Sequence, residues 1–270
     1  MRVHHLNCGT MCPPLQRLLL GTGRLLSRGR IVCHCLLVET DEGLVLIDTG
    51  FGLGDLRSPE RLCATRHLLS PRFEESETAI RQIEALGFTA DDVRHIVLTH
   101  LDLDHAGGLG DFPRAKVHAL RRERDAAANP APKDRARYRT AQWAHDPDWS
   151  LYDVDGGRFF GFEAVRDLVG LPPEILLVPL HGHSAGHAGV AVDTDSGWLL
   201  HAGDAYFFHA EMDPDRPHCP PGFRAFQSLV AFDDARRKWN QRRLQALVRE
   251  HRHEVRVFSA HDSAEFASFG

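Results

Sequence analysis

The chain has 270 residues, of which 43% are hydrophobic and 26% charged, a composition that is ordinary for globular proteins and excludes disordered and fibrous classes. The net charge of −5 argues against a protein that follows nucleic-acid phosphates, because such proteins are usually basic. No apolar run approaches the roughly 20 residues that a membrane-spanning helix needs. The N-terminal MRVHHLNCGT also lacks the apolar core of a signal peptide. We therefore expect a cytoplasmic protein that binds neither nucleic acid nor membrane.

The first strands are predicted at 31–40 and 43–50, separated by the turn-prone Asp41-Glu42-Gly43. A helix is predicted to follow Ser76, because apolar residues recur at helical spacing up to the stop at Gly87. Further strands are predicted at 94–100, 115–120, 174–180, 188–194, 197–204 and 255–262. Charged helices are predicted around 121–128 and at about 233–251.

The chain shows no repeat and no linker, so we expect one α/β (α+β) domain over residues 1–270. Residues 129–163 read as irregular, with several prolines and many aromatic side chains. This segment is a candidate insertion that forms part of a substrate pocket, since apolar walls are typical of small-molecule sites. The same aromatic residues could equally belong to the core.

Four polar side chains crowd the stretch LTHLDLDHAGGL at 98–109: His100, Asp102, Asp104 and His105. Burying such a group is costly unless something compensates it, and a metal ion would do so. Because side chains alternate along an extended chain, His100 and Asp102 would point to one side. Gly107 and Gly108 would let the backbone pass close to a crowded centre.

Three later strand ends carry the same residue types. LHGHSAGHAG follows EILLVPL (174–180), HAGDA ends GWLLHAGD (197–204), and SAHDSAEF follows VRVF. A single histidine or aspartate at a strand end is usually a turn or capping residue. Four such segments in order indicate a metal site.

With these residues the chain resembles the metallo-β-lactamase superfamily. Its pattern appears as HLDLDH (100–105), GHSAGH (182–187), AGDA (202–205) and SAHD (259–262), preceded by LVLIDTG. The resemblance implies an αββα sandwich with a dinuclear metal site at one edge of its two sheets.

The resemblance also implies a division of the ligands. His100, position 102 and His183 would hold a first metal, Asp104, His105 and His261 a second, and Asp204 would bridge them. Asp48 and His187 would support these ligands from behind, as carboxylates often do for metal-bound histidines.

Asp102 departs from the common pattern, which has histidine at that position. An additional carboxylate favours harder ions. We therefore expect two divalent ions, with zinc as the first choice and iron or manganese as alternatives because of Asp102. A non-ligating Asp102 would leave a mononuclear site.

Two bridged cations lower the pKa of a shared water, so we expect hydrolysis by a metal-bound hydroxide. Asp104 would carry the proton to the leaving group, and Tyr206 would donate to the developing oxyanion. Core packing at the strand edge is the alternative role for Tyr206. Tyr206 and the stretch from His261 to Phe266 resemble the N-acyl homoserine lactonase branch. The expected substrate is therefore a small molecule, a lactone or another carboxylic ester. A glyoxalase II-like thioesterase, an iron-bound redox enzyme and a small-ligand sensor remain alternatives, and the oligomeric state is open.

Overall fold

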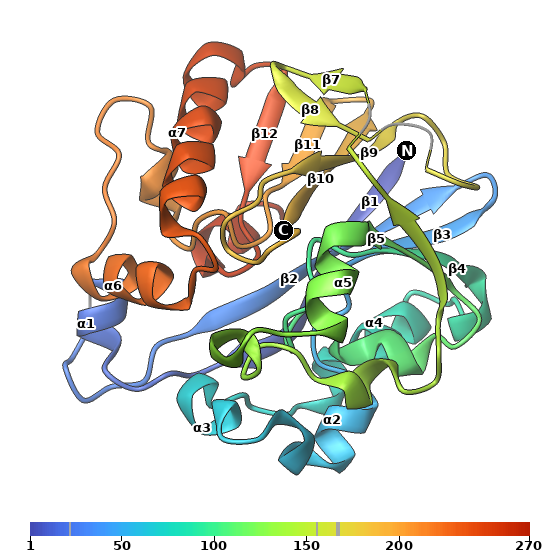
Figure 1. Cartoon of the computed structure of the whole chain (residues 1–270), viewed down its shortest axis with the longest axis horizontal. Helices are drawn as coiled ribbons and strands as arrows, with labels where there is room; N and C mark the ends of the chain where they lie inside the picture. Colours follow the sequence, from blue (N-terminus) through green and yellow to red (C-terminus); the bar gives the residue numbers. More distant parts are fainter. Residues whose placement is uncertain (22, 155, 166–167) are drawn as a thin grey trace.

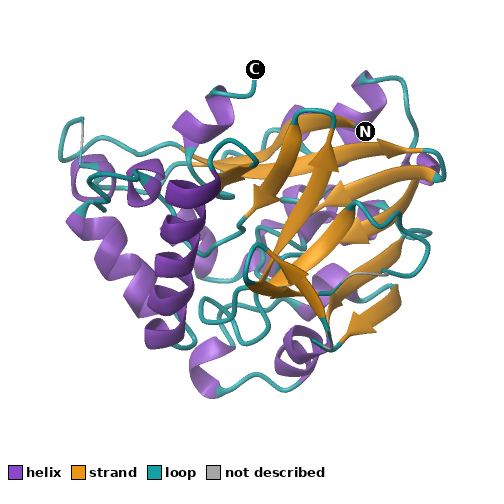
Figure 2. Ribbon diagram, turned by 90° about the horizontal axis from the view of Figure 1, so that it is seen from above, coloured by secondary structure: helices purple, strands orange, loops and turns teal. Residues whose placement is uncertain are grey.

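The computed structural model describes residues 1–21, 23–154, 156–165 and 168–270. Two β-sheets face each other with helices on their outer sides, as Figures 1 and 2 show. The predicted αββα sandwich is confirmed.

The larger sheet has six strands in chain order, β1-β2-β3-β4-β5-β6. β1 to β3 are antiparallel, whereas β3 to β6 are parallel. The strands are β1 (Arg2–Met11), β2 (Ile31–Thr40), β3 (Gly43–Ile47), β4 (Val93–Val97), β5 (Lys116–Leu120) and β6 (Asp148–Tyr152).

The smaller sheet has the order β12-β11-β10-β9, with β11 and β12 parallel. Its strands are β9 (Ile175–Pro179), β10 (Ala188–Thr194), β11 (Gly197–His201) and β12 (Val255–Phe258). A separate hairpin pairs β7 (Gly157–Phe159) with β8 (Phe162–Ala164).

The helices are α1 (Gln16–Leu20), α2 (Leu53–Arg57), α3 (Thr65–Leu69), α4 (Ala79–Ala85), α5 (Arg121–Ala128), α6 (Pro221–Val230), α7 (Asp234–His251) and α8 (Ser263–Ala267). α4 and α5 pack on the outer face of the larger sheet, and α7 covers the smaller sheet (Figure 1). α1 and α6 lie side by side away from both sheets.

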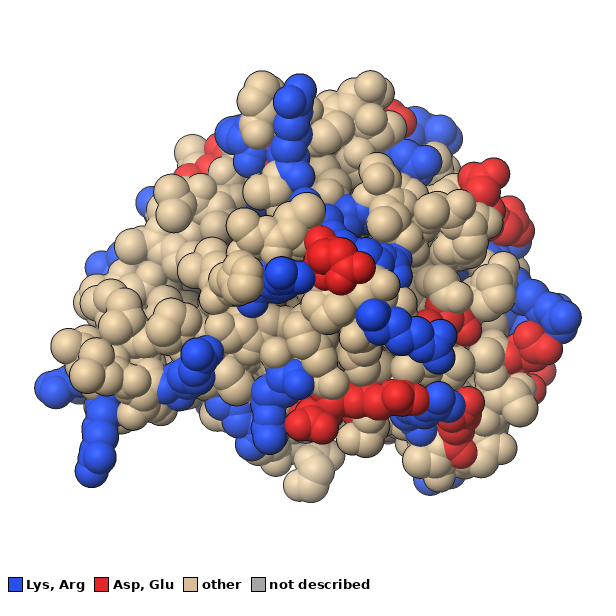
Figure 3. Space-filling model, turned by 90° about the horizontal axis from the view of Figure 1, so that it is seen from below, with Lys and Arg blue, Asp and Glu red and all other residues tan. Residues whose placement is uncertain are grey.

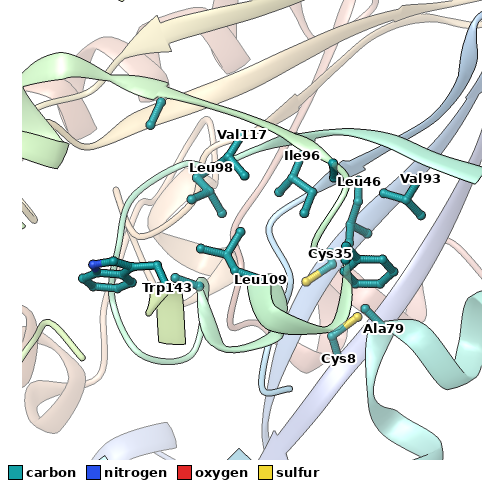
Figure 4. Close-up of a cluster of buried hydrophobic side chains, with 14 of the residues drawn as sticks. Cys8, Cys35, Leu46, Ala79, Val93, Ile96, Leu98, Leu109, Val117 and Trp143 are labelled. Carbon is teal, nitrogen blue, oxygen red and sulfur yellow. The ribbon is translucent and has the colours of Figure 1, made fainter. Parts of the chain in front are cut away.

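Strand alternation builds the layers. On β2, Cys35 and Leu37 face the helix-side core, whereas Leu36 and Val38 face the second sheet. This is the period of two that a strand buried on both faces requires. Figure 4 shows the helix-side core, where strand residues meet Ala79 of α4 and Trp143.

The elements that the sequence did not predict are the strands β1, β6, β7 and β8 and the helices α1, α2, α3, α6 and α8. β6 lies within 129–163, so this segment is partly a strand at the edge of the larger sheet rather than irregular throughout. Helix α4 also begins later than expected, with Thr78 rather than Ser76 at its N-cap.

On the face in Figure 3, Lys and Arg side chains are interspersed with Asp and Glu. Within the described ranges, no helix combines the length and apolar character needed to cross a bilayer.

Candidate metal centre

The loops after four strands bring the seven predicted ligands together. His100 to His105 follow β4, His183 follows β9, Asp204 follows β11, and His261 follows β12. Their nitrogen and oxygen atoms form overlapping groups whose members lie within 4.8 Å of one another. The sequence-predicted ligands are therefore neighbours in space.

The first set of donors contains His100, Asp102, His183 and one oxygen of Asp204. Asp102 Oδ2 lies 3.4 Å from His100 Nε2 and 3.0 Å from His183 Nε2. Asp204 Oδ2 lies 3.8 and 3.3 Å from the same two nitrogens. Four ligands about 2.1 Å from one ion stand roughly 3.4 Å apart in a tetrahedron, so these spacings suit a cation.

The second set uses the other oxygen of Asp204. Oδ1 of this residue lies 3.3 Å from His105 Nε2 and 3.1 Å from His261 Nε2. Asp104 Oδ2 is 3.5 Å from His261 Nε2. Because the two oxygens of Asp204 face different sets, its carboxylate has the geometry of a bridge.

Asp48 orients the histidines of both sets. Its Oδ2 accepts hydrogen bonds from His105 Nδ1 at 2.8 Å and from the Thr99 hydroxyl at 2.7 Å. Since that hydroxyl donates to Asp48, it accepts from His100 Nδ1, 2.9 Å away. Both rings therefore carry hydrogen on Nδ1 and present the lone pair of Nε2 to the centre.

His187 supports the bridging residue. Its Nδ1 donates to the Leu180 carbonyl at 3.0 Å, and its Nε2 accepts the backbone N–H of Asp204 at 2.9 Å. Gly203, which precedes Asp204, has φ +53°, and a Cβ on this residue would lie 2.6 Å from His187 Nε2. Only glycine fits this turn without displacing the histidine.

Gly107 makes a close approach, but to the turn after β3 rather than to the ligands themselves. A Cβ on this residue would lie 2.4 Å from Asp55 Oδ2 and 2.6 Å from the Gly50 carbonyl oxygen. The turn after the ligand cluster is thus packed against the 48–52 turn.

The electrostatics of the centre call for positive charge. Burial disfavours the charged form of His105, yet the carboxylates of Asp204 and Asp48 raise its pKa well above the ordinary value. Burial likewise opposes ionisation of Asp204, but His261 and His105 hold its pKa well below its usual range. The pKa of His261 is raised in the same way by Asp204 and Asp104. In contrast, burial and Arg137 lower the pKa of His183 to about 4. The carboxylates therefore favour positive charge on the second set.

Unpartnered atoms show where a metal would fit. Among the described residues, His100 Nε2 and Asp204 Oδ1 are buried without a hydrogen-bond partner. A buried polar atom without a partner is costly. A cation in the first set would bind His100 Nε2, and a cation in the second set would bind Asp204 Oδ1, which would remove both costs. The donor set of imidazoles and carboxylates fits divalent ions such as zinc, iron or manganese.

Sequence reasoning missed Glu123 on α5. Its buried carboxylate accepts the backbone N–H of Leu101 at 3.1 Å, and the Ser184 hydroxyl and Gly186 N–H at 2.7 and 2.8 Å. It therefore ties the loop of His100 to the loop of His183. A glutamate in a charged helix gives no sequence signal for this role.

Two other residues at the centre were also missed. Arg137 contacts Asp102 and His183 from the 129–163 segment. Cys33, on β2, has its sulfur within 4.8 Å of donor atoms of Asp104 and His261. Neither lies in a recognisable motif.

A cavity of about 460 Å³ opens onto the ligands. Its wall is largely apolar and includes Leu68 and Leu69 of α3, Phe223 and Phe226 of α6, and Phe207. The 129–163 segment contributes Lys133, Asp134, Ala136 and Arg137 to this cavity. Its aromatic residues Tyr138, Trp143, Phe159 and Phe162 lie in the hydrophobic cores instead.

Tyr206 occupies a different position from the expected one. It is fully buried in the core beneath the smaller sheet, and its hydroxyl donates to Glu265 at 2.7 Å. In the described part of the chain, the cavity-lining residue of this turn is the adjacent Phe207, which packs against His183 and His261. The hydroxyl of Tyr206 is therefore not directed at the metal centre.

The fold and ligand arrangement match a known family. The model of the metallo-beta-lactamase superfamily matches residues 28–240. A probable metallo-hydrolase of Mycobacterium tuberculosis is 43% identical over 97% of this chain and 80% of its own length. The chain therefore belongs to the metallo-beta-lactamase superfamily, and the resemblance predicted from the sequence is confirmed.

More distant relatives narrow the comparison. An N-acyl homoserine lactonase of Bacillus thuringiensis subsp. kurstaki is 26% identical over 80% of this chain and 77% of its own. A solved N-acyl homoserine lactone hydrolase with N-hexanoyl-L-homoserine at its metal centre gives a TM-score of 0.73 at 21% identity. That match covers 98% of this chain and 95% of the other. At such identity the likeness shows the fold alone, whereas family and relatives together support a metal-dependent hydrolase.

Proposed function

We propose that this protein is a metal-dependent hydrolase that opens lactones or cleaves other carboxylic esters. The observation that carries the proposal is the pair of donor sets joined by Asp204, which face a largely apolar cavity. The named lactonase relatives favour an acyl substrate.

The metal would be held by His100, Asp102 and His183 on one side and by Asp104, His105 and His261 on the other, with Asp204 between. A divalent ion in such a site lowers the pKa of a bound water to near neutral and polarises a carbonyl oxygen. We propose two divalent ions, with zinc as the first choice and iron or manganese as alternatives because of the additional carboxylate of Asp102.

The proposed proton carrier is Asp104. Its carboxylate lines the cavity, and among the described residues it is one of the few acceptors that face the space a substrate would enter. We propose that Asp104 takes the proton released when the acyl carbon is attacked and delivers it to the leaving alkoxide oxygen.

The apolar wall would bind the acyl part of the substrate. Phe207, Phe223 and Phe226 present rings to the cavity, and the leucines of α3 extend the same surface. An alkyl chain buried there gains about 0.8 kcal/mol per methylene. Longer acyl chains should therefore lower KM until the cavity is filled.

The experiment is hydrolysis of one substrate panel by protein loaded separately with zinc, manganese or iron(II). The panel holds acyl-homoserine lactones of increasing chain length, simple γ- and δ-lactones, a glutathione thioester and an aryl phosphodiester, with Asp104→Ala as the blank. Lactone turnover that is lost in the variant supports the proposal. Turnover of the thioester alone would favour the glyoxalase II-like alternative, and binding without turnover would favour a redox enzyme or sensor.

The remaining expectations follow from this proposal. We propose that the protein binds a small-molecule substrate and binds neither nucleic acid nor a membrane. We also propose a cytoplasmic location. Fractionation of the producing cells, with detection of the protein and of lactone hydrolysis in each fraction, tests the location.

A further inference from the structure

A cation from outside the ligand set already touches the first set of donors. Arg137 Nη1 lies 2.5 Å from Asp102 Oδ2 and 2.8 Å from His183 Nε2. These are two of the four atoms that the first metal would need. The guanidinium is nearly buried, with 8% of the side chain exposed.

Arg137 and a metal ion would compete for the same lone pair of His183 Nε2. A guanidinium carries only donors, so His183 Nε2 must accept the hydrogen bond with its lone pair. A ring nitrogen has one lone pair in the plane of the imidazole, and that pair binds either an N–H group or a metal. While Arg137 stays in place, His183 is therefore withheld from the first set.

Arg137 is held in this place from two sides. Its backbone N–H donates to the Asp134 carbonyl at 3.0 Å, which fixes the turn that carries it. Its Nη2 donates to the carbonyl oxygen of Val230, the last residue of α6. The contact with the ligands is thus part of the packing between the 129–163 segment and α6.

Among the described residues, the second set has no contact like that of Arg137. His105 Nδ1 bonds to Asp48 and His261 Nδ1 bonds to the Val32 carbonyl, and in both rings this nitrogen faces away from the centre. Lys133, the other cation of the cavity, donates to the Phe232 carbonyl and stacks on that ring rather than touching a ligand. The two sets, similar in donor type, therefore differ in their access to a metal.

We propose that Arg137 is an internal competitor for the first metal position, so that the second set binds its ion first and the first set fills only as Arg137 is displaced. This inference rests on the proposed metal-dependent function and concerns the order in which the two metal positions are filled. Because Arg137 also bonds α6, which walls the cavity, filling the first set would release the Val230 carbonyl and loosen that wall.

The experiment is a titration of metal-stripped protein with cobalt(II), followed by visible absorption and by equilibrium dialysis with metal analysis. We expect wild-type protein to bind one ion tightly and a second at least about tenfold more weakly. Arg137→Gln removes the charge. It should strengthen binding of the second ion, so that the ratio of the two dissociation constants falls about tenfold or more. Arg137→Met carries the same prediction should the glutamine variant not fold, as judged by circular dichroism.

Lys133→Met is the matched control, because it removes a cation from the same cavity without touching a ligand. It should leave both binding constants close to the wild-type values. Equal constants for two ions in the wild type, unchanged constants in Arg137→Gln, or an equal effect of Lys133→Met would each overturn the inference while leaving the proposed function intact. Absence of metal binding in every protein would overturn both.

Discussion

The substitution Asp48→Asn should weaken metal binding without removing a ligand. The Asp48 carboxylate accepts three hydrogen bonds, from the Thr99 backbone N–H, the Thr99 hydroxyl and His105 Nδ1. An amide keeps the shape but offers one oxygen and one NH₂ group. One former acceptor must therefore face a donor.

Both orientations of the amide are unfavourable. With the NH₂ group toward His105, the imidazole must move its hydrogen to Nε2, where the metal would bind. With the NH₂ group toward the Thr99 N–H, a buried backbone donor loses its partner at a cost of about 1–3 kcal/mol. Loss of such a supporting partner typically weakens metal affinity 10- to 100-fold, which corresponds to about 1.4–2.7 kcal/mol.

The assay is competition between protein and a chelator of known affinity, with unfolding by denaturant measured on the same samples. Asp55→Asn is a matched control, because Asp55 is an equally buried carboxylate that accepts from Gln142 and the Gly52 N–H rather than from a ligand. It should change stability but not metal affinity. Unchanged affinity in folded Asp48→Asn would refute the orienting role.

Three further predictions concern residues around the centre. Burial raises the pKa of Glu265 to about 7, so the folded chain keeps a proton that the unfolded chain loses near pH 4.5. The protonated carboxyl therefore adds about 3 kcal/mol to the free energy of unfolding. This stabilisation is complete below the unfolded pKa and is lost as the pH rises through the folded pKa. The stability of the wild type relative to Glu265→Gln should therefore fall by most of that amount between pH 5 and 8 in denaturant titrations, and a constant difference would contradict the assignment. Tyr206→Phe should lower the free energy of unfolding by about 1 kcal/mol with unchanged kcat and KM for a lactone, whereas a large loss of kcat would return its hydroxyl to the mechanism. Glu123→Gln turns an amide donor toward the loops of His100 and His183 and should lower the free energy of unfolding by about 1–3 kcal/mol. The same denaturant titration measures this loss, and a stability equal to that of the wild type would show that the Glu123 hydrogen bonds are dispensable.

The sequence predicted which side chains gather at the centre, because the pattern that identifies them is local. The cluster from His100 to His105 follows an apolar strand, and His183, Asp204 and His261 stand at the same point after other strands. Neighbouring strand ends of a sandwich lie at one edge, so order along the chain predicts proximity in space. Asp48, which directly follows β3, lies beside His105 for the same reason.

The residues that the sequence missed depend on long-range packing. Arg137 reaches the centre from a stretch without periodicity, and nothing in its neighbours indicates where its side chain points. At 206 and 207 the turn presents Phe207 to the cavity and buries Tyr206. Adjacent residues of a turn point to different sides, so an error of one position exchanges core and cavity.

β1 and β6 were missed for a related reason. Their sequences, RVHHLNCGTM and DWSLY, mix polar and apolar residues without clean alternation. Both are edge strands of the larger sheet, and their position is set by pairing with β2 and β5 rather than by a hydrophobic pattern of their own.

The most direct test of the central claim is the rate of lactone hydrolysis measured against bound metal. Protein is stripped with a chelator, dialysed, and assayed with an acyl-homoserine lactone while zinc, manganese or iron(II) is returned in known amounts. We expect no turnover in stripped protein, recovery in proportion to bound metal, and no recovery in Asp204→Asn at the same metal concentrations. Full turnover by stripped protein, or metal-loaded protein that hydrolyses no lactone, would contradict a metal-dependent lactonase.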